Sequence, residues 1–219
     1  MGSSPAVRTI MASDTRQLDA DTLHLWRGDL HVLRGLSFSL DAGRCLQVTG
    51  PNGAGKSSLL RALAGLLPLE SGTVRWRGLD TRKDHFAFHS ELAWLSHATA
   101  LKGDLSALEN LRYSAGLRRV LAAADIETAL ERVGYTRSEQ RLARQMSAGQ
   151  QRRVALARVL LLDCALWLLD EPTSNLDSHG QEMFGQILHA HLERGGLAVV
   201  ATHQALPLPA ARLQNLELS

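Results

Sequence analysis

Short apolar runs separated by turns alternate along this chain with stretches in which apolar residues recur at helical spacing. Between residues 18 and 40, apolar side chains take alternate positions on both sides of Gly28 and Asp29, which is typical of two antiparallel strands joined by a turn. A shorter alternating segment at residues 74–77 predicts one more such strand. Further strands, most of them continuous apolar runs, are predicted at residues 45–49, 165–169, 197–201 and 213–218.

Helical spacing dominates the middle of the chain. Residues 58–65 follow the loop after the first continuous apolar strand and predict a helix. From residue 106 to about 144 the apolar positions again have a helical period, with Gly116 and Gly134 as breaks. Two later helices are predicted at residues 147–162 and near residues 181–194.

The order of these elements is typical of a parallel α/β core that carries an all-helical insertion. A chain of 219 residues is long enough for one large domain of this class. We therefore expect a single domain at residues 18–219, with a helical subdomain inserted at about residues 98–160. Residues 1–17 are small, polar and weakly patterned, and we expect them to form a flexible N-terminal extension.

Composition and charge limit the possible partners. The net charge is only +2 and the arginines are spread along the chain, so solvated faces explain them better than a nucleic-acid-binding patch does. No run approaches the ~18 apolar residues that a membrane span needs, so we expect any membrane role to come from a partner. Cys45 and Cys164 lie far apart within apolar segments and are predicted to be buried, reduced thiols.

A phosphate-binding pattern, G-x-x-x-x-G-K-S, lies between the first continuous apolar strand and its helix. It consists of Gly50, Pro51, Asn52, Gly53, Ala54, Gly55, Lys56 and Ser57, and Ser58 follows it. Its glycines allow backbone N–H groups to surround an anion at the helix N-terminus. We expect Lys56 to reach the β- and γ-phosphates of a nucleoside triphosphate and the Ser57 hydroxyl to bind Mg²⁺. The alternative, a glycine-rich turn with a solvated lysine, is disfavoured because lysine is scarce in this chain.

Two carboxylates follow the strand predicted at residues 165–169. Asp170 comes first and is expected to hold Mg²⁺ through water, whereas Glu171 is placed to polarise an attacking water molecule. A solvated acidic turn is the alternative for this pair in isolation. The phosphate-binding loop elsewhere in the chain favours the catalytic interpretation.

Three further segments make the chain resemble the ATP-binding subunits of ABC transporters. They are the run Met-Ser-Ala-Gly-Gln-Gln-Arg-Arg-Val-Ala-Leu-Ala-Arg at residues 146–158, Ser-Asn-Leu-Asp at residues 174–177, and Val-Val-Ala-Thr-His at residues 199–203. The resemblance implies an α/β fold with a P-loop NTPase (RecA-like) core, an N-terminal antiparallel β subdomain and an inserted helical subdomain. It also implies ATP and Mg²⁺ as ligands, and catalytic roles for Glu171, His203 and Lys56.

In this family the segment at residues 146–158 is the signature motif. The resemblance implies that Ser147, Ala148, Gly149 and Gln150 bind the γ-phosphate of ATP held by a second subunit. Hydrolysis then needs a head-to-tail homodimer in the ATP-bound state. A serine and a glycine at a helix N-terminus suit phosphate, although a plain N-capped helix is the alternative.

Two positions depart from the family pattern. The position usually occupied by the Q-loop glutamine is His97, whose shorter side chain puts direct contact with the metal in doubt. The aromatic residue that stacks on adenine should lie just before Gly28, where the chain has Trp26 and Arg27. Either a guanidinium or an indole can stack on the base, so both remain candidates.

Several features together resemble one subgroup, the ATP-binding subunits of the haem exporter used in bacterial cytochrome c maturation. They are the short length, His97, and the sequence Leu-Trp-Leu-Leu-Asp-Glu-Pro at residues 166–172. This resemblance implies a peripheral protein on the cytoplasmic face of the inner membrane, bound to integral membrane subunits and without direct contact to haem or nucleic acid. The alternatives are an ATPase subunit of a drug, lipid or lipoprotein exporter, or a soluble ABC ATPase acting on nucleic acid or ribosomes.

Overall fold

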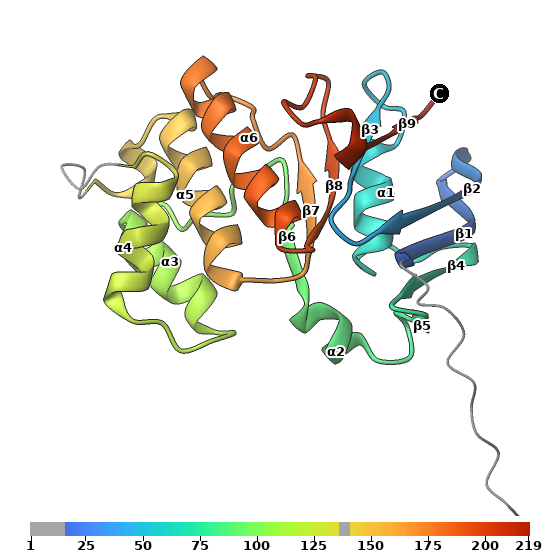
Figure 1. Cartoon of the computed structure of the whole chain (residues 1–219), viewed down its shortest axis with the longest axis horizontal. Helices are drawn as coiled ribbons and strands as arrows, with labels where there is room; N and C mark the ends of the chain where they lie inside the picture. The colour runs from blue at the N-terminus through green and yellow to red at the C-terminus, as the bar shows by residue number, and fades with distance from the viewer. Residues whose placement is uncertain (1–15, 136–140) are drawn as a thin grey trace, which may run out of the picture.

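An antiparallel sheet, a parallel sheet and a block of helices lie side by side across the molecule (Figure 1). The computed structural model describes residues 16–135 and 141–219. Most of the predicted N-terminal extension therefore lies outside the described residues, but its last two residues belong to the first strand, which begins at Arg16.

The antiparallel sheet has the strand order β2-β1-β4-β5. Its strands are β1 Arg16–Arg27, β2 Leu30–Asp41, β4 Ser71–Trp76 and β5 Leu79–Asp80. In β1, Leu23 and Leu25 are buried while His24 between them is only partly covered. This alternation is the pattern expected of a sheet with one face on the core, and it made β1, β2 and β4 predictable from the sequence. The two-residue β5 was not predicted.

The parallel sheet has the order β6-β7-β8-β3-β9. Its strands are β3 Cys45–Thr49, β6 Leu92–Leu95, β7 Leu166–Asp170, β8 Leu197–Ala201 and β9 Leu213–Glu217. Every residue of β7 and β8 is buried, which accounts for their continuous apolar sequences. In this register Asp170 lies beside Ala201, so the carboxyl ends of β7 and β8 meet at one edge of the sheet.

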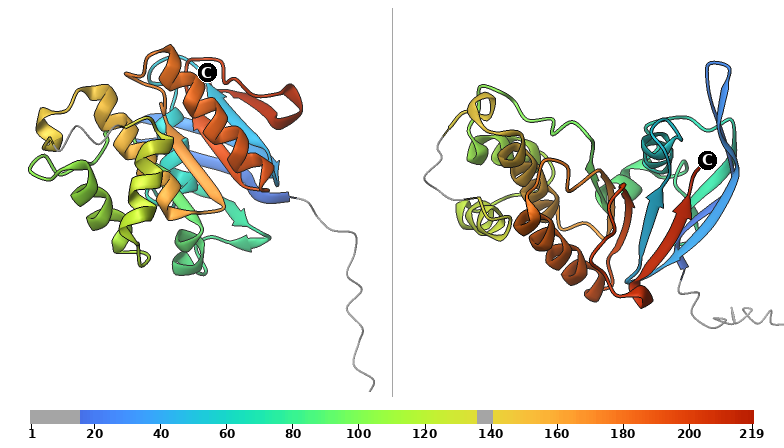
Figure 2. Two further views of the ribbon diagram at one scale, coloured as in Figure 1. Left: turned by 60° about the vertical axis from the view of Figure 1, so that its left-hand side comes forward. Right: turned by 90° about the horizontal axis from the view of Figure 1, so that it is seen from above.

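Helices cover both faces of the parallel sheet (Figure 2). They are α1 Lys56–Leu63, α2 His85–Ser90, α3 Ala107–Gly116, α4 Ala123–Arg132, α5 Ala148–Leu162 and α6 Ser178–Glu193, with short 3-10 helices at Ala143–Gln145 and Ala210–Arg212. Helices α3, α4 and α5 pack together as the predicted helical subdomain (Figure 1). The sequence analysis missed α2 and β6, which are too short to show a clear period.

Two hydrophobic clusters fill the interior, one on each side of the parallel sheet. Leu166 and Leu168 of β7 belong to the cluster shared with α1 and the antiparallel sheet, whereas Trp167 and Leu169 belong to the one shared with α5 and α6. Cys45 and Cys164 are buried free thiols, as predicted. Among the described residues no helix is both long and apolar enough to cross a membrane.

Candidate active site

A cleft of about 550 Å³ opens where the carboxyl ends of several parallel strands meet the start of α1. This is the edge at which open α/β sheets generally bind ligands. The cleft is lined by Arg27, Asn52, Gly53, Gly55, Lys56, Ser57, Ser58, His97, Asp170, Glu171, Ser174 and His203. All of these belong to motifs or positions that the sequence analysis singled out, although they come from five separate segments, and only Ser174 was not predicted to bind the ligand.

The loop between β3 and α1 has a backbone that only glycine can follow. Gly55 caps α1 in a left-handed conformation, with φ of 99°, and a Cβ there would lie 2.3 Å from Val32. At Gly50, which has φ of 136°, a Cβ would lie 2.3 Å from the carbonyl oxygen of Leu218. Since no side chain caps α1, its first N–H groups are free of a side-chain acceptor. These features fit a phosphate group at the helix N-terminus.

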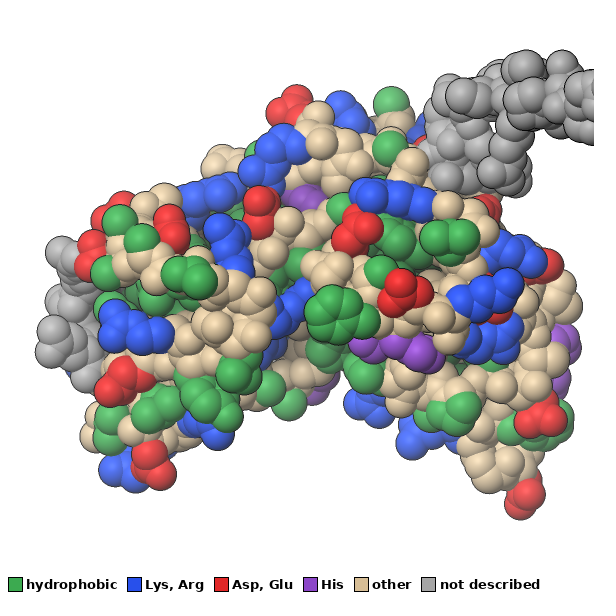
Figure 3. Space-filling model, turned by 90° about the horizontal axis from the view of Figure 1, so that it is seen from below, with side chains coloured by type: hydrophobic (Ala, Val, Ile, Leu, Met, Phe, Trp, Pro, Cys, Tyr) green, Lys and Arg blue, Asp and Glu red, His purple; other side chains and the backbone are tan. Residues whose placement is uncertain are grey.

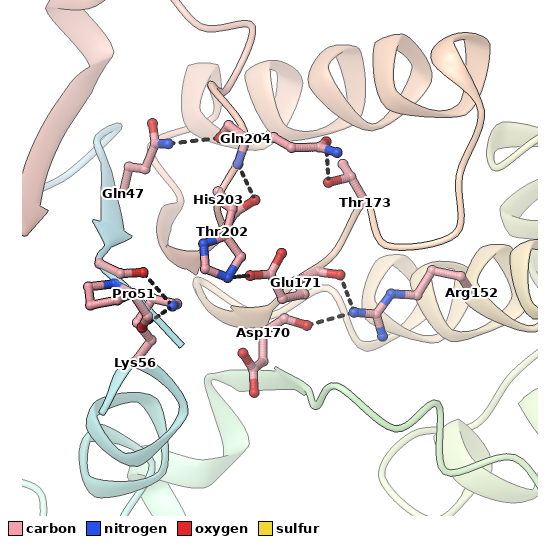
Figure 4. Close-up of polar contacts among 11 residues, drawn as sticks. Gln47, Pro51, Lys56, Arg152, Asp170, Glu171, Thr173, Thr202, His203 and Gln204 are labelled. Carbon is pink, nitrogen blue, oxygen red and sulfur yellow. Dashed lines mark hydrogen bonds and ion pairs between the residues drawn. The ribbon is translucent and has the colours of Figure 1, made fainter. Parts of the chain in front are cut away.

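Lys56 lies over this loop (Figure 4). Its Nζ donates to the carbonyl oxygens of Gly50, at 2.7 Å, and Pro51, at 3.0 Å, and the side chain is mostly buried. The loop thus holds a fixed positive charge beside the N-terminus of α1. Both features favour a polyanionic ligand.

Glu171 and His203 face each other across the ends of β7 and β8 (Figure 4). His203 Nε2 lies 3.4 Å from Glu171 Oε1, but the pair lacks hydrogen-bond geometry and that buried oxygen has no hydrogen-bond partner among the described protein groups. A buried acceptor without a hydrogen-bond partner is suited to binding a water molecule. Asp170 is 3% exposed and ends β7 beside the loop of Lys56.

A set of hydrogen bonds around Gln204, which the sequence analysis did not predict, holds the segment after β8. Gln47 of β3 donates through Nε2 to the carbonyl oxygen of Gln204 at 2.9 Å, and the Thr173 hydroxyl donates to Gln204 Oε1 at 3.2 Å. The Gln204 N–H donates to the Thr202 hydroxyl at 3.2 Å. These bonds fix the chain on both sides of His203. The available signal was the amide side chain of Gln47 within a mostly apolar strand.

The two departures from the family pattern have different positions. His97 follows β6 and lines the cleft. Arg27 also lines the cleft, whereas Trp26 stacks on His31, with ring centroids 4.2 Å apart and planes 6° apart, and is not a lining residue. The structure therefore brings Arg27, and not Trp26, to the phosphate-binding loop.

The segment at residues 147–150 is not part of this cleft. Ser147 caps α5: its Oγ accepts the Gln150 N–H at 3.1 Å, and Gln150 Oε1 accepts the Ser147 N–H at 2.8 Å. Gly149 packs against residue Asn175, whose carbonyl oxygen would lie 2.6 Å from an added Cβ. The turn is thus exposed at the start of α5 and braced against the segment that follows β7.

Comparison with known proteins decides the family. The ABC transporter family profile matches residues 33–174, from β2 through the cleft and signature segments. The chain belongs to the ABC transporter family. An ABC ATPase domain binds ATP, and ATP hydrolysis coupled to transport is its activity.

Similar proteins cover nearly the whole ABC ATPase domain. Cytochrome c biogenesis ATP-binding export protein CcmA 2 of Cupriavidus metallidurans is 46% identical over 90% of this chain and 93% of its own length. CcmA of Nitrosococcus oceani is 40% identical over 100% of both chains. A solved bacterial ABC transporter cassette, MJ0796, described as dimeric, has a TM-score of 0.79 at 23% identity and covers 91% of this chain and 94% of its own. The expected fold is confirmed.

The residues available for a metal fit magnesium better than a transition metal. Among the residues that the structure describes, no group of three or more His, Cys, Asp and Glu side chains could hold a metal ion. Ser57 and Asp170 both line the cleft and offer oxygen atoms. Mg²⁺ typically takes one or two protein oxygens and completes its shell with water and phosphate oxygens.

Proposed function

We propose that this chain is the ATP-hydrolysing subunit of a cytochrome c biogenesis exporter, and that the exported cargo is haem or a haem-loaded chaperone. The observation that carries this proposal is the 40–46% identity to CcmA proteins along nearly the full length of both chains. The ATPase subunit does not contact haem in this proposal. It supplies the free energy of ATP hydrolysis to membrane subunits.

In the proposed mechanism, the loop from Gly50 to Ser57 and the N-terminus of α1 bind the ATP phosphates, with Arg27 stacked on adenine. Lys56 leaves the loop carbonyls to contact the β- and γ-phosphates. Glu171 accepts a proton from the attacking water, and His203 binds the γ-phosphate and keeps that water in line. Ser57 and Asp170 would hold Mg²⁺, which offsets the negative charge of the phosphates.

The proposed active unit is a head-to-tail homodimer formed when ATP is bound. Its support is the position of Ser147, which lies outside its own cleft at an exposed helix N-terminus. In a second copy, Ser147 to Gln150 would close over the ATP held by the first. The dimeric MJ0796 cassette has the same fold, which is consistent with such an arrangement.

We place the membrane subunits on α2, the end of α3 and the loop at residues 97–106. Phe86 of α2 is 87% exposed, and Leu117 at the end of α3 is 75% exposed. Arg118 donates to main-chain oxygens of His89 and Ser90, so the ends of these two helices lie together. Exposed apolar side chains of this size are suited to a protein partner. The chain is then a peripheral protein at the cytoplasmic face of the inner membrane.

A nucleic-acid partner is a weaker alternative. On the face shown in Figure 3, described Lys and Arg side chains are interspersed with Asp and Glu and form no continuous basic field. Binding to phosphate backbones depends on clustered positive charge. A different exporter cargo would leave the ATPase mechanism unchanged.

The test is affinity purification of the tagged chain from detergent-solubilised native membranes, with co-purifying proteins identified by mass spectrometry. Recovery of cytochrome c maturation proteins supports the proposal, recovery of an unrelated permease refutes the cargo, and recovery of ribosomal or DNA-repair proteins refutes the transporter role. Phe86→Asp should lose the membrane subunits. Leu79→Asp is the matched control, because Leu79 is 71% exposed but lies on β5.

A further inference from the structure

Arg152, on the second turn of α5, is a buried cation bound by main-chain oxygens. Only 1% of its surface is exposed. Its Nε donates to Pro172 at 3.2 Å, its Nη1 to Ser96 at 2.9 Å and His97 at 3.3 Å, and its Nη2 to Asp170 at 2.6 Å and to Glu171. A guanidinium has five N–H donors, so each of them has an acceptor.

These acceptors belong to separate parts of the candidate active site. Ser96 and His97 follow β6, while Asp170 and Glu171 lie at the end of β7 and lead into Pro172 (Figure 4). The side chain comes from a third element, α5, whose N-cap is Ser147. One residue therefore joins the helical subdomain to two edges of the cleft.

The bond to Glu171 has a particular consequence because that residue has an unfavourable backbone conformation. Its φ is +49°, in the left-handed region that residues with a Cβ rarely adopt. Its N–H donates to Ala201 at 2.8 Å, and its carbonyl oxygen accepts from Arg152. Both main-chain polar groups are thus held, and the carboxylate is directed toward His203.

We propose that Arg152 is a positioning residue for ATP hydrolysis, which fixes the backbone of Glu171 and ties it to the His97 loop and to α5. This inference rests on the proposed role of Glu171 as the general base. Arg152 does not touch the reacting atoms in this arrangement. Because Ser147 lies at the start of the same helix, binding of a second subunit's nucleotide there would be transmitted to Glu171 through Arg152.

The chemistry of the contact requires an arginine. Burial lowers the pKa of Arg152 to about 10, against the opposing effect of the Asp170 and Glu171 charges, so the side chain is still a cation at pH 7. A lysine would keep the charge but offers three donors on one compact ammonium, which cannot span both strand ends. Burying a cation is costly, so stability alone is a poor reason for one at this position.

The test compares Arg152→Lys with Arg212→Lys in the transporter purified with its membrane subunits. Arg212 is the matched control, since its Nη1 also donates to main-chain oxygens of two separate segments, at Gly43 and Leu192, and it lines neither the cleft nor the proposed docking surface. The measurements are kcat and KM for ATP, the Kd for ATP on the isolated chain, and thermal melting of each variant.

We expect Arg152→Lys to lower kcat by about 10–100-fold with ATP affinity nearly unchanged, whereas Arg212→Lys keeps kcat near the parent value. In a Glu171→Gln background, Arg152→Lys should change the residual rate by less than about twofold, because the group that it positions is gone. An unchanged kcat, an equal loss in both arginine variants, or a loss of folding or ATP binding in Arg152→Lys would each overturn the inference. If Glu171→Gln itself hydrolysed ATP at the parent rate, the proposed base would be wrong instead.

Discussion

The helices α1 and α5 both begin with a turn suited to phosphate, but their N-termini are built differently. The turn before α1 contains three glycines, carries no side-chain cap and opens into the cleft with Lys56 beside it. The turn before α5 is a closed capping box, in which Ser147 and Gln150 satisfy each other's N–H groups. The first turn is thus free to bind an anion, while the second is satisfied by its own side chains.

This difference indicates that the two turns have separate roles. The loop before α1 has Asp170, Glu171 and His203 facing it within the same chain. The turn before α5 faces none of them and is exposed at the surface. The proposed phosphate-binding role of this turn requires that another molecule bring the nucleotide to it. The comparison therefore predicts that nucleotide binding and dimer formation can be lost separately.

The chemical step of ATP hydrolysis should depend only on the first region, which is the turn before α1 and the cleft that it faces. Replacing Glu171 with Gln keeps the size of the side chain but removes the proton acceptor, and we expect kcat in the assembled transporter to fall by roughly 10²–10⁴-fold. ATP binding should persist, so the variant should accumulate as the ATP-bound dimer. Glu193→Gln, on the exposed end of α6, is the control and should hydrolyse normally. If Glu171→Gln hydrolysed ATP at the parent rate, Glu171 would not be the general base.

Dimer formation should depend on the second region, which is the turn before α5. In the Glu171→Gln background, Ser147→Arg would place a long side chain where the partner's phosphates are expected and remove the cap of α5. We expect the dimer dissociation constant to rise by about 30-fold or more, the size of a lost hot-spot contact. Size-exclusion chromatography with ATP measures this effect. Ser39→Arg, at an exposed position of β2, is the control.

Ser147→Arg should leave nucleotide binding by the single chain unchanged, because Ser147 lies outside its own cleft. If the variant still formed dimers with ATP, the head-to-tail arrangement would be wrong. If it bound ATP weakly as a monomer, the two regions would not be separable.

Nucleotide binding should depend on the backbone of the first turn. Gly55→Ala introduces a Cβ 2.3 Å from Val32 Cγ1 at a residue with φ of +99°. The strained loop should weaken ATP binding to the monomer by about 10-fold, as measured by titration with a fluorescent ATP analogue. Gly78→Ala is the control, since φ there is +79° but nothing lies within 4 Å and the residue is far from the cleft. An unchanged affinity in Gly55→Ala would argue against a tightly shaped loop.

Local sequence signals explain why much of this architecture was predictable. Strands β3 and β8 have the predicted bounds, because a parallel strand buried on both faces is a continuous apolar run between turns. The start of α5 at Ala148 was marked by the cap Ser147. Strand β6 was missed because its four residues are ordered by pairing with β7, which lies 70 or more positions further along the chain.

The site was predictable only where a motif fixes the spacing. The cleft lining from Asn52 to Ser58 followed from one pattern. Whether Arg27 or Trp26 faces the cleft depends on the alternation of β1 against β2, which a count along the sequence does not determine. The hydrogen bonds of Arg152 and those around Gln204 join segments that are far apart in sequence, so no local sequence pattern predicts them.

Lowering the pH should affect both regions together, because it lowers the stability of the domain that contains them. His191 of α6 stacks on Trp167 of β7, with ring centroids 3.8 Å apart, and its Nε2 bonds the Leu197 carbonyl oxygen. Burial lowers the pKa of His191 to about 4, despite that hydrogen bond. The unfolded chain, with a histidine pKa near 6.5, then takes up a proton at a pH where the folded chain does not.

Stability should therefore be constant above about pH 7 and fall as the pH drops from about 6.5 toward 4. At pH 5.5 this one group should lower the free energy of unfolding by about 1 kcal/mol relative to pH 7.5, as measured by urea unfolding at the two values. His191→Gln should remove that difference, whereas His189→Gln, on the more exposed side of the same helix, should retain it. Because the whole domain unfolds as one unit, the urea concentrations at which ATP binding and dimer formation are lost should fall together at the lower pH. A dimer that failed at a pH where the monomer still bound ATP would show that the second region has a titrating group of its own.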